Sequence, residues 1–480
     1  MYILGIHDGH NCGASLILNG KVLFSICEER ISRNKNEVGY PTESINRVLF
    51  LSDIQASQLS AVVYASNFMH SEDHLKNVTP WYKVGEADQE KDLEEPSEYK
   101  DIIFTERRKE RIQKVCNHLN LSESNVHFVE HHLAHLSAAY YTRPRDLFKG
   151  KVLGLTCDGA GDGLSATVSI CEQNSIKRIS SSSRHASLGK LYSRITMLMG
   201  MKPWEHEYKL MGMAPYADSE RADNATDIFR KILTVDKETL EFKNLTSLSM
   251  NYSYEYLRDS FEGIRFDVIS ASIQKFTEEM LLAWVKHAIR KTGITKIVCG
   301  GGVFMNVKAN MLIASLPEVE AMYVMPSGGD ESLSIGAALE YYSQQKNSSN
   351  DICGFDNLYL GGAAPDIDDE DNLVNSLDNK TILVSKPKDI EEEIAILLSK
   401  MQIVARCRGD MEWGARSLGN RSILCRADNY AVVDKINSMI KVRDFWMPFA
   451  PSILDECSEK YFSDIKKIRP YYMTFAFRGN

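Results

Sequence analysis

The clearest candidate for chemistry in this sequence is a pair of histidines. Residues 129–140 contain them among small and apolar residues, a composition that favours an α-helix. On such a helix His131 and His135 lie one turn apart on the same face, a spacing that suits a divalent metal. A packed or surface histidine cluster is the alternative explanation, and the motif alone favours it by roughly two to one.

A carboxylate far along the chain makes the metal the better explanation. Asp330 follows a Pro/Gly turn at residues 326–329 and comes just before a predicted helix rich in Ala and Gly. Two histidines and one carboxylate leave coordination positions open for substrate or water. We therefore expect His131, His135 and Asp330 to hold a catalytic or phosphate-binding metal rather than a closed structural one. These donors suit iron(II), manganese or zinc.

One pattern of strand and turn occurs twice and must position these residues. A predicted strand at Tyr2–Ile6 leads to Asp8-Gly9-His10, and a second at Val152–Thr156 leads to the glycine-rich turn Asp158–Gly163. Each time the chain then returns as a hairpin. Glycine lets backbone N–H groups approach phosphate, and aspartate can hold a metal or orient a nucleophile. Two ordinary hairpins are the alternative, but the repetition favours a duplicated nucleotide-binding fold.

A glycine cluster follows a third predicted strand. Residues 266–291 have a helical period that ends before Gly293, and a buried strand at Lys296–Cys299 follows. Gly300, Gly301 and Gly302 then lead through Asn306 into another helix, an arrangement that places phosphate or ribose at a helix N-terminus. The sequence is neither a Walker A motif nor a dinucleotide fingerprint, and a purely steric role for the glycines is the alternative.

The length and two polar segments predict more than one domain. A chain of 480 residues is too long for a single hydrophobic core. Segments rich in Asn, Ser and Asp at residues 344–351 and 365–371 resemble linkers, so we place a domain boundary between residues 351 and 352. In the second domain we expect a helix at 390–401 and strands at 403–406 and 471–477.

Positive charge gathers among glycines in this second domain. The block at residues 409–424 is rich in arginine and glycine, and a second basic segment follows near the aromatic residues 445–449. Arginines held in this way favour bidentate recognition of phosphate or carboxylate. A surface basic patch is the alternative, at about one chance in three. The four basic residues concerned are Arg416, Arg421, Lys441 and Arg443.

Composition excludes several classes of partner. The formal net charge is −9, and the chain has no basic stripe, so we expect no nucleic-acid partner. No apolar stretch approaches the ~20 residues of a membrane span, and no basic segment precedes the short apolar run at the start, so we expect no membrane partner and a cytoplasmic location. The ten cysteines are scattered and predict reduced thiols. Base rates for soluble enzymes favour a homodimer.

Taken together, these segments resemble the bacterial O-carbamoyltransferase family, whose members carbamoylate nodulation factors, aminoglycosides and cephalosporins. The matching segments follow the order of the family along nearly the whole chain, and such an ordered set is far more specific than any one motif. They are His7–Asn11, Glu28–Arg30, His131–His135, Asp158–Gly163, Glu207–Gly212, Gly301–Val303 with Asn306, Gly329–Asp330 and the block at 409–424.

The resemblance implies both a fold and an activity. The fold class would be α/β, with an N-terminal actin-like ATPase domain (a duplicated RNase H-like fold) over residues 1–351 and a smaller α+β domain over 352–480. Family members form carbamoyl adenylate from carbamoyl phosphate and ATP and pass the carbamoyl group to a hydroxyl. The first domain would carry out this transfer, and the second would activate carbamoyl phosphate. The second domain of the family is longer, so the resemblance predicts a truncated one here.

The resemblance also assigns roles to residues. His131, His135 and Asp330 would hold iron(II) or another divalent metal, with Mg²⁺ accompanying ATP. Asp8 and His10 would flank the acceptor hydroxyl, with His10 as general base. The four basic residues of the second domain would neutralise phosphates, Arg416 and Arg421 among them as catalytic groups. The predicted nucleotide contacts are Gly9, Asp158, Gly159, Gly161, Asp162, Gly163, Glu207, Lys209, Gly301, Gly302, Asn306, Gly329, Lys441 and Arg443.

Two other functions compete with the carbamoyltransferase. An actin-like small-molecule kinase or ATPase would phosphorylate its acceptor, but it leaves the histidine site and the arginine block unexplained. A non-catalytic nucleotide-binding remnant would bind ATP or adenylate and form no product. For the transferase, the partner is a small-molecule acceptor with a sugar-like or natural-product hydroxyl, whose identity the sequence does not specify.

Overall fold

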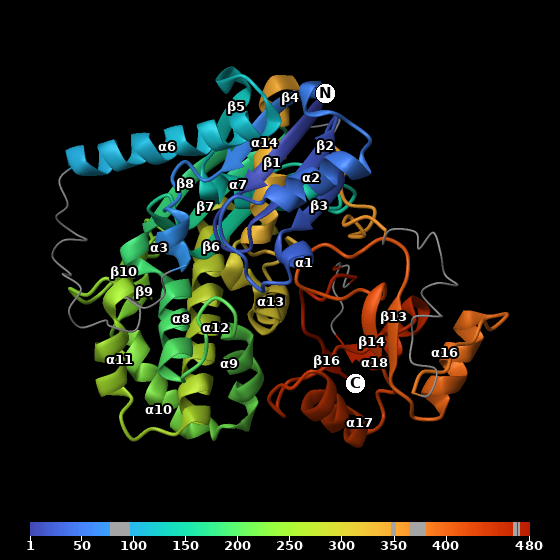
Figure 1. Cartoon of the computed structure of the whole chain (residues 1–480). Coiled ribbons are helices and arrows are strands. Elements are labelled where there is room, and N and C mark those ends of the chain that lie inside the picture. Colours follow the sequence, from blue (N-terminus) through green and yellow to red (C-terminus); the bar gives the residue numbers. More distant parts are fainter. Residues whose placement is uncertain (77–96, 347–351, 364–380, 464–467, 469–470) are drawn as a thin grey trace. The chain divides into compact units, whose positions relative to one another are not determined.

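The computed structural model describes residues 1–76, 97–346, 352–363, 381–463, 468 and 471–480. Figure 1 shows the chain coloured along its sequence. It forms two compact units: Met1–Asn357 together with Ile453–Asn480, and Leu358–Ser452. Residues 347–351 of the first predicted linker and the whole of the second, 365–371, lie outside the described residues. The assignment of separate activities to residues 1–351 and 352–480 stays a prediction.

Two five-stranded sheets with the same strand order form the centre of the first unit. In each sheet the central strand pairs antiparallel with its hairpin partner and parallel with a strand that follows a crossover. This repeated α/β topology is the duplicated arrangement of actin-like ATPases, so the predicted fold class is confirmed. The first sheet has the order β3 (Lys21–Cys27), β2 (Gly13–Leu18), β1 (Tyr2–His7), β4 (Leu59–Ala65), β5 (Val126–Val129). The second has the order β8 (Ser175–Ser183), β7 (Leu164–Glu172), β6 (Val152–Gly161), β11 (Lys296–Gly300), β12 (Ala321–Val324).

Local sequence explains why the hairpins form where they do. Asn19 and Gly20 join β2 to β3 with φ values of 48° and 82°, the left-handed conformation that two-residue hairpin turns require. Most of β1 and the first six residues of β6 are buried, because α14 packs against β1 and α7 and α8 pack against β6. The first five residues of β1 after Tyr2 are buried without interruption. The predicted strand-turn-strand pattern is therefore present in both repeats.

Two equivalent helices pack closely between the repeats. Helix α7 (His131–Thr142) follows the last strand of the first sheet, and α14 (Leu333–Lys346) follows the last strand of the second. A Cβ atom on Gly336 of α14 would lie 1.8 Å from the carbonyl oxygen of Ala134 in α7. A Cβ atom on Gly5 of β1 would lie 1.9 Å from the carbonyl oxygen of Ser334. These glycines let α14 contact both α7 and β1, as Figure 1 shows.

A helical insertion between β8 and β11 completes the second repeat. Its longest helix, α12 (Phe266–Thr292), ends at Gly293 with a φ of 69°, as the sequence predicts. Among the described residues the largest fully buried side chain is Trp284, which lies on α12 in the main core cluster with Phe229 and Phe276. The other α-helices of the insertion are α8 (Leu188–Leu198), α9 (Glu207–Met213), α10 (Ser219–Arg230) and α11 (Tyr254–Ser260), and α13 (Val307–Ala314) follows β11. The remaining elements of this unit are α1 (Glu29–Ser32), α2 (Thr42–Leu51), α3 (Glu72–Lys76), α6 (Ser97–Leu119), β9 (Leu233–Val235), β10 (Phe242–Asn244), α18 (Ser458–Tyr461), β15 (Phe462–Ser463) and β16 (Arg478–Gly479).

The prediction of a strand over residues 471–477 is wrong. These residues are not part of any strand, and only Arg478–Gly479 pairs, with Phe462–Ser463. Two hydrogen bonds hold the segment against α13 instead. Asn310 Nδ2 donates to the carbonyl oxygen of Thr474 at 2.8 Å, and the amide of Ala476 donates to the carbonyl of Val307 at 3.0 Å. The apolar sequence pattern of residues 471–477 cannot distinguish a strand that pairs in a sheet from a segment that packs against the end of a helix.

The second unit has a short hairpin beside one helix. Helix α16 (Ile390–Ser399) and strand β13 (Val404–Cys407) match the helix and strand predicted there, and β13 pairs with β14 (Arg421–Leu424). Helix α17 (Tyr430–Lys435) follows. Among the described residues of the whole chain, no helix combines the length and apolar character that crossing a membrane requires.

Candidate active site

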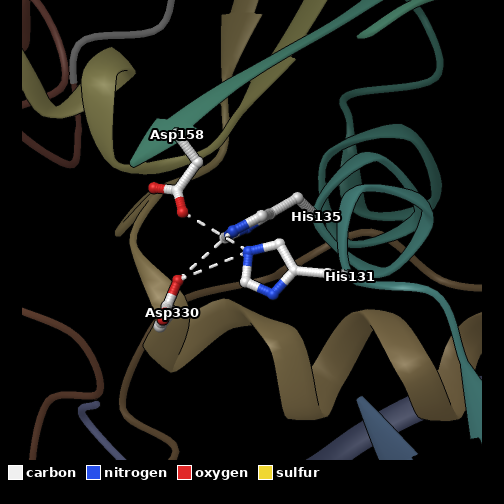
Figure 2. Close-up of side chains that lie close together, drawn as sticks. All are labelled: His131, His135, Asp158 and Asp330. Atoms are coloured by element: carbon white, nitrogen blue, oxygen red, sulfur yellow. Dashed lines mark hydrogen bonds and ion pairs between the residues drawn. The ribbon is translucent and has the colours of Figure 1, made fainter. Parts of the chain in front are cut away.

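Four side chains converge where α7, α14 and β6 meet, as Figure 2 shows. They are His131, His135, Asp158 and Asp330, and one donor atom from each lies within 4.8 Å of the others. His131 Nε2 lies 3.4 Å from Asp158 Oδ2, and His135 Nε2 lies 3.4 Å from Asp330 Oδ1. The structure brings the three predicted metal ligands together and adds Asp158, which the sequence placed at the nucleotide.

The first turn of α7 positions the two histidines. Glu130 caps the helix by accepting from the amide of Leu133 at 2.8 Å. Asp162, in the β6–β7 turn, accepts the amide of His131 at 2.9 Å and also the amides of Asn67 and Phe68. Its carboxylate therefore joins three segments of backbone. Asp162 lies in the predicted glycine-rich turn, but its observed partners are protein amides.

Two serines orient the imidazoles. Ser66 Oγ lies 2.9 Å from His131 Nδ1, and Ser332 Oγ lies 3.2 Å from His135 Nδ1. Ser332 donates its one hydrogen to the carbonyl of Gly329 at 2.8 Å, so its oxygen must accept from His135 Nδ1–H. The lone pair of His135 is then on Nε2. Such hydrogen bonds to the far ring nitrogen fix the tautomer of a metal-binding histidine.

The donor set fits a cation. His135 Nε2 is buried and has no hydrogen-bond partner among the described residues, and its lone pair faces the Asp330 carboxylate. A lone pair and a carboxylate repel one another unless a proton or a metal cation lies between them. Two imidazoles and two carboxylates suit iron(II), manganese or zinc. These four residues could therefore hold the predicted divalent metal.

The charges of the site lead to the same conclusion. Burial opposes protonation of His131, but the neighbouring carboxylates Asp158 and Asp330 outweigh it and raise its pKa to about 9. Burial also opposes ionisation of Asp330, yet His135 and His7 hold its pKa well below the usual range. The site thus keeps its carboxylates charged and attracts a positive charge. A metal ion would replace the proton that His131 otherwise holds.

His10, the predicted general base, lies at the turn after β1 beside an unpredicted aromatic residue. Burial lowers the pKa of His10 to about 4, so its imidazole is neutral near pH 7. The ring of Trp204 lies 4.3 Å from the His10 ring, between centroids. Trp204 has a φ of 64°, a strained conformation for a bulky residue, and Glu207 stabilises it by accepting the Trp204 amide at 2.7 Å. Nothing in the local sequence indicates this conformation.

Asp8, the other residue predicted to flank the acceptor, is part of a buried ion pair. Its two oxygens accept from Arg111 Nε and Nη2, both at 2.8 Å. Arg111 also donates to the carbonyls of Ser66 and Ala65, at 2.8 and 3.0 Å. The ion pair therefore joins α6 to the turn that follows β1 and to the segment that contains Ser66. Arg111 lies in a highly charged stretch of sequence that resembles an ordinary solvated helix.

The predicted glycine turn adjoins the four-residue cluster. The amide of Gly302 donates to Asp158 Oδ1 at 2.8 Å. Gly301 has a φ of 97°, and a Cβ atom there would lie 2.3 Å from the carbonyl oxygen of Cys157. Asn306 caps α13 by accepting the amide of Ala309 at 3.0 Å. The other predicted nucleotide contacts of this unit lie in the turn after β1, at the end of β6, in the β6–β7 turn, before α14 and on α9: Gly9, Gly159, Gly161, Gly163, Gly329, Glu207 and Lys209.

The predicted phosphate-binding arginines lie in the second unit. Arg421 begins β14 and donates to the carbonyls of Arg408 and Gly409, at 2.8 and 3.0 Å. Glu412, which the sequence did not single out, accepts the amide of Arg421 at 2.9 Å and those of Leu418 and Asn420 at 2.8 Å. These three amides outweigh burial and lower the pKa of Glu412.

The second basic segment of this unit contains Arg443, Lys441 and Phe449. Arg443 donates to Asn437 Oδ1 at 2.6 Å, and its guanidinium lies 4.2 Å from the Phe449 ring centroid. Arg416 belongs to the loop that Glu412 organises, and Lys441 is exposed. The roles of these four basic residues stay predictions.

Comparison with known proteins identifies relatives of the whole chain. Residues 2–339 match the family model described as carbamoyltransferase N-terminus, and residues 395–480 match carbamoyltransferase C-terminus. An uncharacterised protein of Methanocaldococcus jannaschii is 30% identical over 98% of this chain and 81% of its own length. The nodulation protein NolNO of Sinorhizobium fredii is 26% identical over 95% of this chain and 64% of its own length. Among solved structures, HypF of T. kodakarensis covers 73% of this chain and 49% of its own, at 13% identity and a TM-score of 0.39.

The N-terminal family model alone matches more than half of the sequence, and the C-terminal model follows it in the same order. The resemblance predicted from the motifs is confirmed. The chain belongs to the carbamoyltransferase family and is a transferase.

Proposed function

We propose that this chain is an ATP-dependent O-carbamoyltransferase. In this proposal carbamoyl phosphate, ATP and one water molecule give carbamoyl adenylate, inorganic phosphate and pyrophosphate. The carbamoyl group then passes from the adenylate to a hydroxyl of a sugar-like or natural-product small molecule. Membership of the carbamoyltransferase family supports the proposal that the transferred group is a carbamoyl group. The acceptor is a small molecule, neither a nucleic acid nor a membrane, in keeping with the net charge of −9. The homodimer and the cytoplasmic location remain predictions.

The observation that carries the proposal is the double role of Asp158. One carboxylate oxygen lies 3.4 Å from His131 Nε2, and the other accepts the amide of Gly302 at 2.8 Å. A nucleotide held at the glycine turn would therefore adjoin the four possible metal ligands. A divalent ion bound there, with iron(II) as our first choice, would act as a Lewis acid on a carbonyl or phosphoryl oxygen. Mg²⁺ would accompany ATP.

The residues of the chain account for the transfer step. The acceptor oxygen attacks the carbamoyl carbon, the bond from that carbon to the phosphate oxygen breaks, and AMP leaves. His10 keeps a neutral imidazole near pH 7, so it can accept the proton of the acceptor hydroxyl. The tilted ring of Trp204 contacts His10 and covers one side of its imidazole. In the activating step Arg416, Arg421, Lys441 and Arg443 would neutralise phosphate charge.

The test is an assay of the purified chain with carbamoyl phosphate, ATP, Mg²⁺ and iron(II). Mass spectrometry follows AMP, pyrophosphate and carbamoyl adenylate. We expect all three, and only when carbamoyl phosphate is present. Arg421→Ala should abolish them. Arg426→Ala is the matched control, because Arg426 belongs to the same unit but is exposed and forms its ion pair with the nearby Asp428.

Two results would contradict the proposal. Turnover of ATP to ADP without carbamoyl phosphate, or phosphorylation of an acceptor, would indicate a kinase or ATPase. Binding of ATP with no product under any condition would indicate a nucleotide-binding remnant. If only activation fails, chemically supplied carbamoyl adenylate should still bind, and His131→Ala should weaken its binding.

A further inference from the structure

A chain of polar side chains connects α12 to the start of α13. Gln274, on α12, is almost fully buried, with 2% of its surface exposed. Its Nε2 lies 2.8 Å from Glu278 Oε1 and 3.1 Å from Asn306 Oδ1. Its Oε1 accepts from Asn306 Nδ2 at 2.8 Å and from the Tyr192 hydroxyl at 3.1 Å. The two amides thus form a reciprocal pair with a carboxylate on one side and a phenol on the other.

The chemistry of Glu278 fixes the orientation of Gln274. A carboxylate only accepts hydrogen bonds, so the Gln274 atom beside it must be the amide nitrogen. Lys308 Nζ lies 3.9 Å from the same Glu278 oxygen and favours its negative charge. Both hydrogens of Gln274 Nε2 are then used, one by Glu278 and one by Asn306. The Gln274 oxygen is left to accept.

The orientation of Asn306 follows from that of Gln274. Asn306 Oδ1 accepts from Gln274 Nε2 and from the amide of Ala309, so both of its lone pairs are engaged. One hydrogen of Asn306 Nδ2 is donated to Gln274 Oε1. In the part of the chain that the structure describes, the other hydrogen has no protein acceptor. Asn306 can therefore contact a ligand only as a donor.

We propose that Gln274, oriented by Glu278 and Tyr192, is a positioning residue that presents Asn306 to the nucleotide as a hydrogen-bond donor. The proposal rests on the proposed function, in which ATP binds at the turn that contains Gly301 and Gly302. It identifies the ligand group at this point as an acceptor, an oxygen of the ribose or of a phosphate. A group that only donates is excluded there, because Asn306 has no free lone pair.

The experiment measures the Kd of ATP with Mg²⁺ by calorimetry. Gln274→Met keeps a similar volume but cannot form hydrogen bonds, and we expect ATP to bind about tenfold more weakly, since one hydrogen bond to the ligand is lost. Glu278→Gln keeps the shape of the side chain but allows both amides to turn over, and we expect about threefold weaker binding. Glu279→Gln is the matched control, because Glu279 is the next residue, is exposed, and pairs with Arg230 instead.

A second readout separates positioning from structure. The KM for ATP should rise in Gln274→Met and Glu278→Gln, while the KM for carbamoyl phosphate and the melting temperature of Glu278→Gln stay at the wild-type values. An ATP Kd in Glu278→Gln equal to that of Glu279→Gln would overturn the inference even if Gln274→Met failed to fold. If the wild-type chain bound no ATP, the proposed function would fall, and this inference with it.

Discussion

Replacing Gly161 by alanine tests whether the position of the His131 ring controls metal binding. A Cβ atom at residue 161 would lie 2.0 Å from His131 Cγ and 2.2 Å from Cδ2. Carbon atoms in contact lie roughly 3.5 to 4 Å apart, so the ring must move by more than about 1 Å. His131 is 3% exposed and is held by Ser66, so little room exists for that movement.

The expected loss is large because the substitution leaves all four donors in the chain but displaces one of them. Changes that disturb the orientation of a metal ligand typically cost about 10- to 100-fold in affinity, or about 1.4 to 2.8 kcal/mol. The metal-free protein should also lose about 1 to 3 kcal/mol of stability through overpacking. Iron(II) affinity is measured by anaerobic titration, and the free energy of unfolding by urea denaturation in the presence of a chelator.

Gly159→Ala is the matched control. Gly159 lies two residues earlier in the same strand, and a Cβ atom there would have nothing within 4 Å. Neither glycine has a positive φ, so alanine adds no backbone strain at either position. We expect Gly159→Ala to bind iron(II) as the wild type does. Equal iron(II) affinity in Gly161→Ala and the wild type, with both proteins folded, would refute the argument that His131 is a ligand held in place by contact with the strand.

Three further predictions concern single contacts. Arg111→Met leaves the buried Asp8 carboxylate without its partner and should lower the free energy of unfolding, measured by urea denaturation, by about 3 to 5 kcal/mol. The double variant with Asp8→Asn should recover part of that loss. A loss below about 1 kcal/mol would contradict a buried ion pair. Ser332→Ala removes the acceptor of His135 Nδ1–H and should weaken iron(II) binding about 10-fold without a comparable loss of stability. An unchanged iron(II) affinity would show that the tautomer of His135 is fixed by other means. Burial raises the pKa of Glu340, so the folded state binds the carboxyl proton more tightly than the unfolded state does, and the free energy of unfolding should fall as pH rises above the ordinary carboxyl range. Glu340→Gln should remove that fall in denaturation curves taken from about pH 4 to 8. An identical pH dependence in the variant and the wild type would exclude this carboxyl as its source.

The elements that local sequence specifies were predictable. Asn19-Gly20 permits one kind of turn, and the helix at 131–142 follows from small and apolar residues with histidines one turn apart. Asp330 could be placed with the histidines because a Pro/Gly turn delivers it to the start of a helix. In each case the signal lies within a few residues of the chain.

The remaining features depend on partners that are distant in sequence. Asp8 and Asp158 occupy the same place in the repeated pattern, yet Asp8 pairs with Arg111 and Asp158 faces His131. No local pattern distinguishes these two environments. The same holds for Gln274, whose partner Asn306 is 32 residues away. Trp204 is a different case, because the Glu207 carboxylate that accepts its amide lies in the same short segment, yet no residue type there signals a positive φ.

The equivalent places of α7 and α14 in the two repeats have a consequence for the molecule as a whole. The first repeat contributes only imidazoles to the cluster, His131 and His135, and the second contributes only carboxylates, Asp158 and Asp330. Neither half of the duplicated fold has a mixed donor set by itself. A cation held by all four would join the two halves noncovalently, much as a cross-link does, so that a rotation of one half against the other would open the coordination sphere. The cluster is therefore complete only where the two repeats meet, because each repeat supplies a single kind of donor.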